Sequence, residues 1–380
     1  MKKIMKRNSF AANLPAFLAC FVLLSFAISC RKNDVKRLKN YDQVNLVANN
    51  GNYGAAHIDP LQINAWGLAW SPTGIAWVNS QAGHVSALYD GEGASPRAAV
   101  GIPSPGGPRT GNPTGIVFNG SADFVLSNGA AARFLFVNLD GVLSGWNGAA
   151  GNDAILLKDN SATSVYTGMA IGVSNGANYI YASDFRSGKI DVWDKNFNPV
   201  EMSFKDPWLP KGYSPFNIQA VGDWLYVAYA KVGPDGRDDK GVGNGVVNIF
   251  NTDGSLVKRF ATRDVLNSPW GVTAAPASFF QDPEDDAAAK SDNSFKTGHQ
   301  YNDTTLILIG NFGDGKINAY STRGEFIGQL KSHGRTVAID GLWAIGFAPT
   351  TATTIDPNRL YFTAGPAAEA DGLFGYLIKK

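Results

Sequence analysis

Cysteine is almost absent from this sequence of 380 residues, and the two that occur, Cys20 and Cys30, both lie close to the N-terminus. No cysteine follows Cys30, so no disulfide can form within the rest of the chain. A small disulfide scaffold is therefore excluded, and the folded part must be held together by the burial of apolar side chains. A single core stops growing at about 250–300 residues, so this length requires two domains or a fold with several small cores.

Histidine and charge are scarce as well. Charged residues make up 17% of the chain. The four histidines are scattered, with no spacing typical of a metal site: His57, His84, His299 and His333. We also find no phosphate-binding loop, no dinucleotide-binding fingerprint and no Gly-x-Ser-x-Gly elbow. The sequence therefore contains no complete catalytic set, and whether the protein is an enzyme stays open.

The first thirty residues have the pattern of an export signal. Four basic residues precede an apolar stretch from Ala11 to Ile28, which Asn13 and Pro15 interrupt. A membrane-spanning helix is the competing interpretation, because the stretch approaches the roughly 20 residues that a span needs. Its end, Phe26-Ala-Ile-Ser-Cys30, resembles a bacterial lipobox, although Ala27 stands where leucine is usual. We therefore expect a signal peptide over 1–29, lipidation of Cys30, and a tether over 30–40.

Cleavage before Cys30 changes the charge balance. It removes four of the 33 basic residues and no acidic ones, which leaves 29 against 32 and a net charge of −3. The basic residues of the tether stand beside the lipid, where they are solvated or contact membrane headgroups. Nucleic-acid binding is disfavoured by the charge and by export. We expect an exported bacterial lipoprotein of the periplasm or outer membrane, held to the membrane through its N-terminal lipid.

What the chain has in abundance is glycine, with 43 residues, and a short phrase that recurs six times. The spacings between successive copies, counted at the third position, are 48, 53, 49, 54 and 73 residues. The copies are Ala65-Trp-Gly-Leu68, Pro113-Thr-Gly-Ile116, Tyr166-Thr-Gly-Met169, Pro215-Phe-Asn-Ile218, Pro269-Trp-Gly-Val272 and Leu342-Trp-Ala-Ile345. A period of this size is typical of propellers and other repeat arrays.

Each repeat contains short apolar strands separated by glycine turns, which predicts a four-stranded antiparallel blade. In the third repeat we expect strands over 166–173, 178–184, 189–193 and 200–204. The last repeat reaches the C-terminus before a fourth strand, whereas Tyr41–Val47 precedes the first repeat without a partner. The sequence therefore predicts an all-β, six-bladed β-propeller over 41–380, whose ring is closed by the N-terminal strand in the last blade.

Several longer phrases resemble a family of uncharacterised exported bacterial proteins expected to be β-propellers. They include Asn112-Pro-Thr-Gly-Ile-Val-Phe118, Gly212-Tyr-Ser-Pro-Phe-Asn-Ile-Gln219, Gly310-Asn-Phe-Gly-Asp-Gly315 and Tyr361-Phe-Thr-Ala-Gly-Pro366. More distantly, the repeats are similar to NHL-type and gluconolactonase-like six-bladed propellers. The resemblance implies the fold and export, and it implies no substrate.

The second position of the repeated phrase is aromatic in four copies, as Trp66, Phe216, Trp270 and Trp343. It falls where each inner strand starts, near one mouth of the central channel. Rings at this mouth could stack on a sugar or another flat ligand, which makes these four the candidate ligand-binding residues. The alternative is that they pack between the blades as core residues.

Polar residues next to the same mouth suggest a second type of site. Gluconolactonase-like propellers hold a divalent cation there with oxygen ligands, and Asn112, Asn217 and Asp340 are the candidate ligands in this chain. Ca²⁺ fits such ligands, because hard cations take carboxylate and amide oxygens. The chain departs from the pattern in having no glutamate at an inner-strand start. The alternative is that these side chains cap loop backbone.

Two functional hypotheses remain open. The first is a non-enzymatic, envelope-tethered lipoprotein that binds a glycan or a protein partner with one face of the propeller. The second is a divalent-metal-dependent hydrolase or lactonase at the channel mouth. A propeller fold alone does not decide between them, because such folds host both kinds of function.

Overall fold

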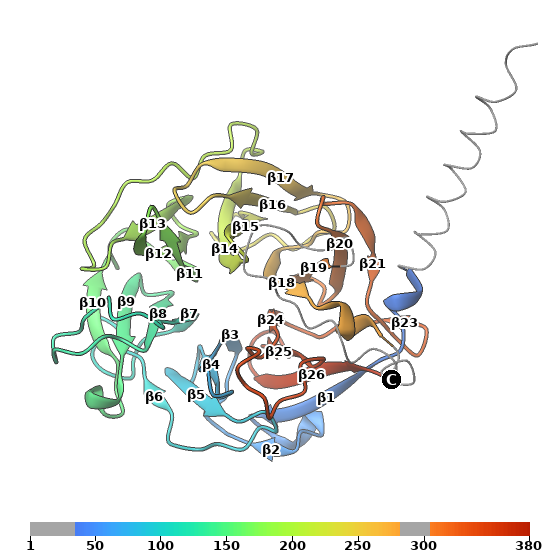
Figure 1. Ribbon diagram of the computed structural model, residues 1–380, viewed down its shortest axis with the longest axis horizontal. Coiled ribbons are helices and arrows are strands. Elements are labelled where there is room, and N and C mark those ends of the chain that lie inside the picture. The colour runs from blue at the N-terminus through green and yellow to red at the C-terminus, as the bar shows by residue number, and fades with distance from the viewer. Residues whose placement is uncertain (1–34, 282–304) are drawn as a thin grey trace, which may run out of the picture.

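Short strands joined by tight turns make up nearly all of the described chain, which comprises residues 35–281 and 305–380 of the computed structural model. Figure 1 shows the sheets arranged like the blades of a wheel around a common centre. The protein is an all-β, six-bladed β-propeller, as the repeat period predicts. No helix in the two described ranges is long and apolar enough to cross a membrane.

The strands follow one another from the centre to the rim in each blade. Blade 1 contains β3 (Ala65–Trp70), β4 (Ala76–Ser80), β5 (Val85–Tyr89) and β6 (Val100–Gly101). Blade 2 contains β7 (Pro113–Phe118), β8 (Phe134–Asn138), β9 (Val142–Trp146) and β10 (Ile155–Asp159). Blade 3 contains β11 (Tyr166–Ser174), β12 (Ala177–Asp184) and β13 (Lys189–Trp193).

The second half of the ring repeats this order. Blade 4 contains β14 (Tyr213–Val221), β15 (Trp224–Lys231), β16 (Gly245–Phe250) and β17 (Leu256–Thr262). Blade 5 contains β18 (Pro269–Ala275), β19 (Leu306–Asn311), β20 (Ile317–Ser321) and β21 (Phe326–Gln329). Blade 6 contains β24 (Leu342–Gly346), β25 (Leu360–Ala364), β26 (Leu373–Lys379) and β1 (Tyr41–Ala48). The short pieces β2 (His57–Ile58), β22 (Lys331–Ser332) and β23 (Arg335–Thr336) lie outside this pattern.

Blade 3 differs from the prediction in its outer strand. The expected strand over 200–204 is irregular, and a single bridge joins Trp193 to Pro199. One backbone hydrogen bond follows, from Val200 N to Val192 O at 2.9 Å. Beyond it, Phe204 N and Lys205 N bond to Met202 O and Ser203 O within the segment, at 3.2 and 2.8 Å, so the ladder does not continue.

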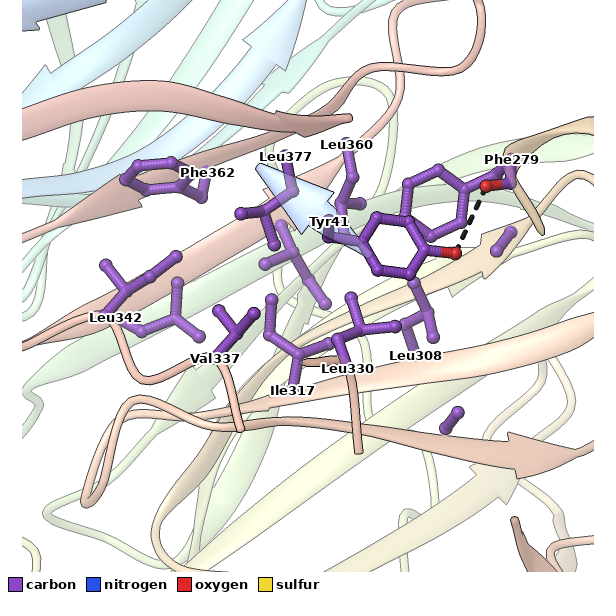
Figure 2. Packing of buried hydrophobic residues seen from close by; sticks show 14 of the residues in the cluster. Tyr41, Phe279, Leu308, Ile317, Leu330, Val337, Leu342, Leu360, Phe362 and Leu377 are labelled. Atoms are coloured by element: carbon purple, nitrogen blue, oxygen red, sulfur yellow. Dashed lines mark hydrogen bonds between the residues drawn. The ribbon is translucent and has the colours of Figure 1, made fainter. Parts of the chain in front are cut away.

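The ring closes as the sequence predicts. Strand β1 pairs with β26 in antiparallel fashion, from Tyr41 opposite Lys379 to Ala48 opposite Leu373. Figure 2 shows Tyr41 packed among apolar side chains of blades 5 and 6, with its hydroxyl directed at the carbonyl oxygen of Phe279 at 3.2 Å. The first described strand therefore fastens the two ends of the chain together.

The core consists of many small clusters instead of one large one. Six clusters of buried side chains each lie between two neighbouring blades, and a seventh lies at the centre of the ring. This arrangement explains how a chain of such length folds without a single large core.

The repeated phrase has a structural cause. The pairing register between the first and second strand shifts at this phrase in all six blades. Such a β-bulge places an extra residue in one strand and changes the direction of a side chain. The third position is crowded: a Cβ added at Gly115 would lie 2.5 Å from Met169 N of the next blade. Glycine recurs there because the inner strands approach one another at the narrow centre of the ring.

Candidate functional site

The bulged residues of the inner strands meet at the centre of the ring. The four aromatic residues predicted as a group do come together, and each is at most 4% exposed: Trp66, Phe216, Trp270 and Trp343. Trp343 lies between two other rings, with ring centroids 3.5 Å from Trp66 and 3.7 Å from Phe312. The rings therefore fill the centre by packing on one another, and ligand stacking on them stays a prediction.

Sequence reasoning missed two rings of this cluster, Phe185 and Phe312. Each is the first residue after the second strand of its blade, following a polar residue that ends the strand, Asp184 and Asn311. Both are at most 5% exposed. The ammonium of Lys240 lies 3.9 Å from the ring centroid of Phe312 and covers it from the solvent side.

We call the side of the propeller at which the inner strands begin the mouth face. In each blade, the loop before the inner strand is joined there to the loop after the second strand. Examples are the bonds from Gln81 N to Asn64 O at 3.1 Å and from Leu139 N to Asn112 O at 3.0 Å. These paired loops hold the polar side chains of this face in fixed positions.

Six side chains from four blades form one continuous chain of hydrogen bonds on the mouth face, which we call the polar arc. In order, they are Arg237, Glu369, Asn64, Gln81, Asn112 and Asp140. They come from blade 4, blade 6, blade 1 twice and blade 2 twice. The two ends are the exposed guanidinium of Arg237 and the carboxylate of Asp140, and between them lie the carboxylate of Glu369 and three amides.

The geometry of the arc is regular. Arg237 Nη2 donates to Glu369 Oε1 at 2.9 Å, and Asn64 Nδ2 donates to Glu369 Oε2 and to Gln81 Oε1, both at 3.0 Å. Gln81 Nε2 then donates to Asn112 Oδ1 at 2.9 Å. The arc is also joined to the aromatic centre, because the Trp343 indole donates to Asn64 Oδ1 at 2.8 Å.

The far end of the arc is a carboxylate. Asp140 accepts the side-chain amide of Asn112 at 3.0 Å and its backbone N–H at 2.7 Å. Asn64 is fully buried and holds its neighbours in place, so the donors and acceptors that the arc presents belong to its other five side chains, which are already ordered. Groups ordered in advance lose less entropy when a ligand binds.

The turn that carries Glu369 is strained. Three successive non-glycine residues, Ala367, Ala368 and Glu369, have positive φ angles of 55°, 54° and 70°. Left-handed backbone costs about 1–2 kcal/mol for each such residue. Asp340 supports the turn, because its Oδ2 accepts from Ala367 N at 2.9 Å. Strain of this kind is concentrated at functional sites, where the surrounding structure maintains it.

The three predicted metal ligands contact different parts of the protein. Asn112 lies in the polar arc, and Asp340 supports the strained turn. Asn217 is 2% exposed, and its Nδ2 donates to Trp270 O at 2.8 Å. No group of three or more His, Cys, Asp and Glu residues in the described part of the chain is arranged to hold a metal ion. The calcium site stays a prediction.

The loop between β15 and β16 adds a carboxyl that sequence reasoning did not single out. Burial raises the pKa of Asp238. This residue directly follows Arg237 of the polar arc and stands two residues before Lys240. The hydroxyl of Ser268 and the charges of Lys240 and Arg237 act to lower this pKa, and burial outweighs them. A carboxyl of this kind can stay protonated at higher pH than usual and can donate a proton.

Several predicted features lie elsewhere. Cys30, the predicted site of lipidation, and the signal peptide over 1–29 fall outside the described residues. Of the arc, Asn64 and Asn112 are visible in the repeat pattern, because they precede inner strands. Gln81, Asp140, Arg237 and Glu369 come from loops of different lengths, and only Gln81 and Asp140 stand close behind a second strand.

The chain is similar to known proteins in sequence and in structure, while no protein-family model matches it. Two uncharacterised proteins of Acanthamoeba polyphaga mimivirus, R648 and L690, are 31% and 32% identical to it over 349 and 355 residues. Each match covers 89% of this chain, and they cover 80% of R648 and 86% of L690. Both relatives are viral, so the bacterial source that the sequence suggests stays a prediction.

The chain is also similar to three solved structures. A streptogramin B lyase is 11% identical, with a TM-score of 0.50, and the match covers 89% of this chain and 96% of the lyase. A virginiamycin B lyase from Staphylococcus aureus has a TM-score of 0.47 and 13% identity, over 90% of this chain and 99% of that one. A gluconolactonase from Xanthomonas campestris has a TM-score of 0.46 and 13% identity, over 83% and 86%. At such identity the likeness concerns the fold alone.

Proposed function

We propose that this chain, which belongs to the family of the uncharacterised mimivirus proteins R648 and L690, is a membrane-tethered glycan-binding lipoprotein. In this proposal, lipid on Cys30 holds the protein at the cell envelope, and the polar arc on the mouth face binds the sugar. Neither relative has an assigned activity, so the proposal is based on the residues of this chain.

The observation that carries the proposal is the strained turn at residues 367–369. A turn with three left-handed residues costs stability, and its effect is to place the Glu369 carboxylate between Arg237 and Asn64. Carboxylate, amide and guanidinium groups in a fixed row match the donors and acceptors of sugar hydroxyls. The aromatic centre supports the row from below, because Trp343 fixes the amide of Asn64.

An array of bacterial-envelope glycans, probed with the purified protein, tests the proposal. We expect a defined set of glycans to be bound, and we expect R237Q and N112L to lose that binding. N196L, in an exposed turn of blade 3, is the matched control and is expected to keep it. Because Arg237 has a side chain 67% exposed, R237Q separates loss of binding from loss of folding. Binding to an envelope protein with no glycan bound would favour the protein-partner alternative.

The buried carboxyl of Asp238 favours a second candidate, a hydrolase or lactonase at the mouth. Its raised pKa suits a general acid, and the predicted calcium ion would supply the electrophile. Lactone and ester turnover, measured with and without a chelator and in D238N, tests this candidate. Chelator-sensitive turnover that D238N abolishes would replace the binding proposal, whereas no turnover of any lactone or ester would remove the hydrolase.

A further inference from the structure

Basic side chains gather at the rim where the described chain begins. We call this group the tether rim, and it consists of Lys36, Arg37, Lys39, Lys331, Arg335 and Lys380. Figure 1 places the start of the described chain, β23 and the C-terminus together at the edge of the ring, between blades 5 and 6. The group thus combines three segments that are far apart in the sequence.

Backbone hydrogen bonds hold these segments together. Lys331 N donates to Leu38 O, and Lys380 N donates to Asn40 O, both at 2.8 Å. The ammonium of Lys379 donates to Arg37 O at 3.0 Å, which fastens the first residues to the end of β26. Leu38 itself is 1% exposed, because it packs into the core between blades 5 and 6. The tether rim is therefore a rigid part of the propeller.

The charge of the tether rim differs from that of the protein. Among the described residues, the carboxylate of Asp42 lies 3.4 Å from Lys380 Nζ, and it also lies 3.2 Å from Nε2 of His333 beside the group. Lys36, Lys39, Arg335 and Lys380 are exposed to solvent. The chain without its signal peptide carries a net charge of −3, so a cluster of six cations is a local feature and not a consequence of composition.

The distance to the proposed lipid is short. Val35, the first described residue, lies five positions after Cys30, and a fully extended chain spans at most about 3.6 Å for each position. If Cys30 carries lipid, as the proposed function states, the start of the rim lies within about 18 Å of the membrane surface.

We infer that the tether rim binds the headgroups of anionic lipids, so that the propeller stands on its edge against the membrane. Several lysine and arginine residues next to an anchored segment are attracted by the negative surface potential of a bilayer. This orientation turns neither face of the ring toward the bilayer. The mouth face with its polar arc then stays open to a ligand.

The test uses the full chain, purified from membranes and placed in phosphatidylcholine vesicles with or without phosphatidylglycerol. A fluorophore on S332C reports from the tether rim, and one on A162C reports from the opposite side of the ring. A headgroup nitroxide lipid quenches whichever label lies near the bilayer. The charge variant is K331Q/R335Q, and its matched control is R186Q/K195Q in blade 3. Intact mass shows whether Cys30 is acylated.

We expect phosphatidylglycerol to increase the quenching at residue 332 and not at residue 162. The increase is lost in K331Q/R335Q, is kept in R186Q/K195Q, and is lost in 1 M salt, where the Debye length is about 3 Å. An acylated protein whose quenching at residue 332 is the same in both lipids overturns the inference and leaves the tether intact. If the protein is not acylated and its quenching still increases with phosphatidylglycerol, the proposed lipidation of Cys30 is wrong and the proposed lipid binding by the tether rim is supported. Failure of both readouts overturns both.

Discussion

Replacement of Trp343 by alanine is the sharpest test of how the centre of the ring is built. Trp343 is 1% exposed and lies between the rings of Trp66 and Phe312. Truncation of a buried tryptophan costs about 3–5 kcal/mol of the free energy of unfolding. The variant also removes the donor to Asn64 Oδ1, and a buried acceptor without a partner costs about 1–3 kcal/mol. We therefore expect W343A to lose about 5 kcal/mol or more.

Two further variants make the result interpretable. W343F keeps an aromatic ring and loses only the indole N–H and part of the area, so it should cost about 1–3 kcal/mol. W208A removes a tryptophan that is 79% exposed and should cost no more than about 0.5 kcal/mol. Urea unfolding followed by far-ultraviolet circular dichroism measures all three without a tryptophan signal. If W343A is as stable as W208A to within about 1 kcal/mol, the centre is not a packed core, and this account of it is wrong.

Three other predictions concern the frame of the propeller. D206A breaks a partly buried ion pair, in which the side chain of Arg259 is 27% exposed, and should cost about 3 kcal/mol because Arg259 is left without its carboxylate. Burial of Asp206 acts to raise its pKa, but hydrogen bonds from Arg259, Trp208 and Asn248 outweigh it, so the pKa in the folded protein lies below 3.8. The stabilisation by this carboxylate is therefore present above pH 3.8 and is lost as the pH falls through the pKa of the folded state. Urea midpoints between pH 5 and pH 2 should fall less steeply in D206N, and equal slopes would contradict the assignment. G115A should cost 2 kcal/mol or more, on the order of an overpacked core, whereas G148A, with no atom within 4 Å of the new Cβ, should be nearly neutral by thermal melting. Deletion of residues 41–48 exposes the edge of β26 and should give aggregates in size-exclusion chromatography; a stable monomer would show that this strand does not close the ring.

The strained turn offers a separate test of the site. A368G relieves a left-handed alanine, with φ 54°, and should raise the melting temperature or leave it unchanged. The same change loosens the position of Glu369, so glycan affinity should fall. A variant that is more stable and binds equally well would mean that the strain has no role in binding.

The fold was predictable because its cause is local and repeated. Each inner strand has a bulge at the same phrase, and the crowding at Gly115 recurs at Gly67, Gly168 and Gly271. A constraint that acts six times leaves a period in the sequence. The closing strand was predictable for a related reason: Tyr41–Ala48 precedes the first repeat and belongs to no repeat of its own, while the last repeat lacks a fourth strand.

The exception in blade 3 shows the limit of such patterns. Val200–Phe204 has strand-like composition, yet its backbone leaves the ladder after the bond from Val200 N to Val192 O. Composition shows that a segment can form a strand, but it does not show whether the backbone of that segment pairs with a neighbour.

The polar arc was only partly predictable. Asn64 and Asn112 occupy fixed places in the repeat, so the sequence points to them. Arg237 and Glu369 lie 132 residues apart, in loops of unequal length, and meet only because blades 4 and 6 both face the centre. A contact that depends on the geometry of the ring produces no regular spacing in the sequence, so the sequence alone does not reveal it. The same holds for the tether rim, where β23 and the C-terminus join the start of the chain.

The most direct test of the central claim, that the polar arc binds the ligand, is a calorimetric titration of the tightest glycan from the array. The account predicts that R237Q and Q81L each weaken binding by about tenfold, the effect of one or two lost hydrogen bonds, while N196L and W208A bind as the wild type does. Equal affinity in all five proteins would contradict the account and move the binding site away from the mouth face.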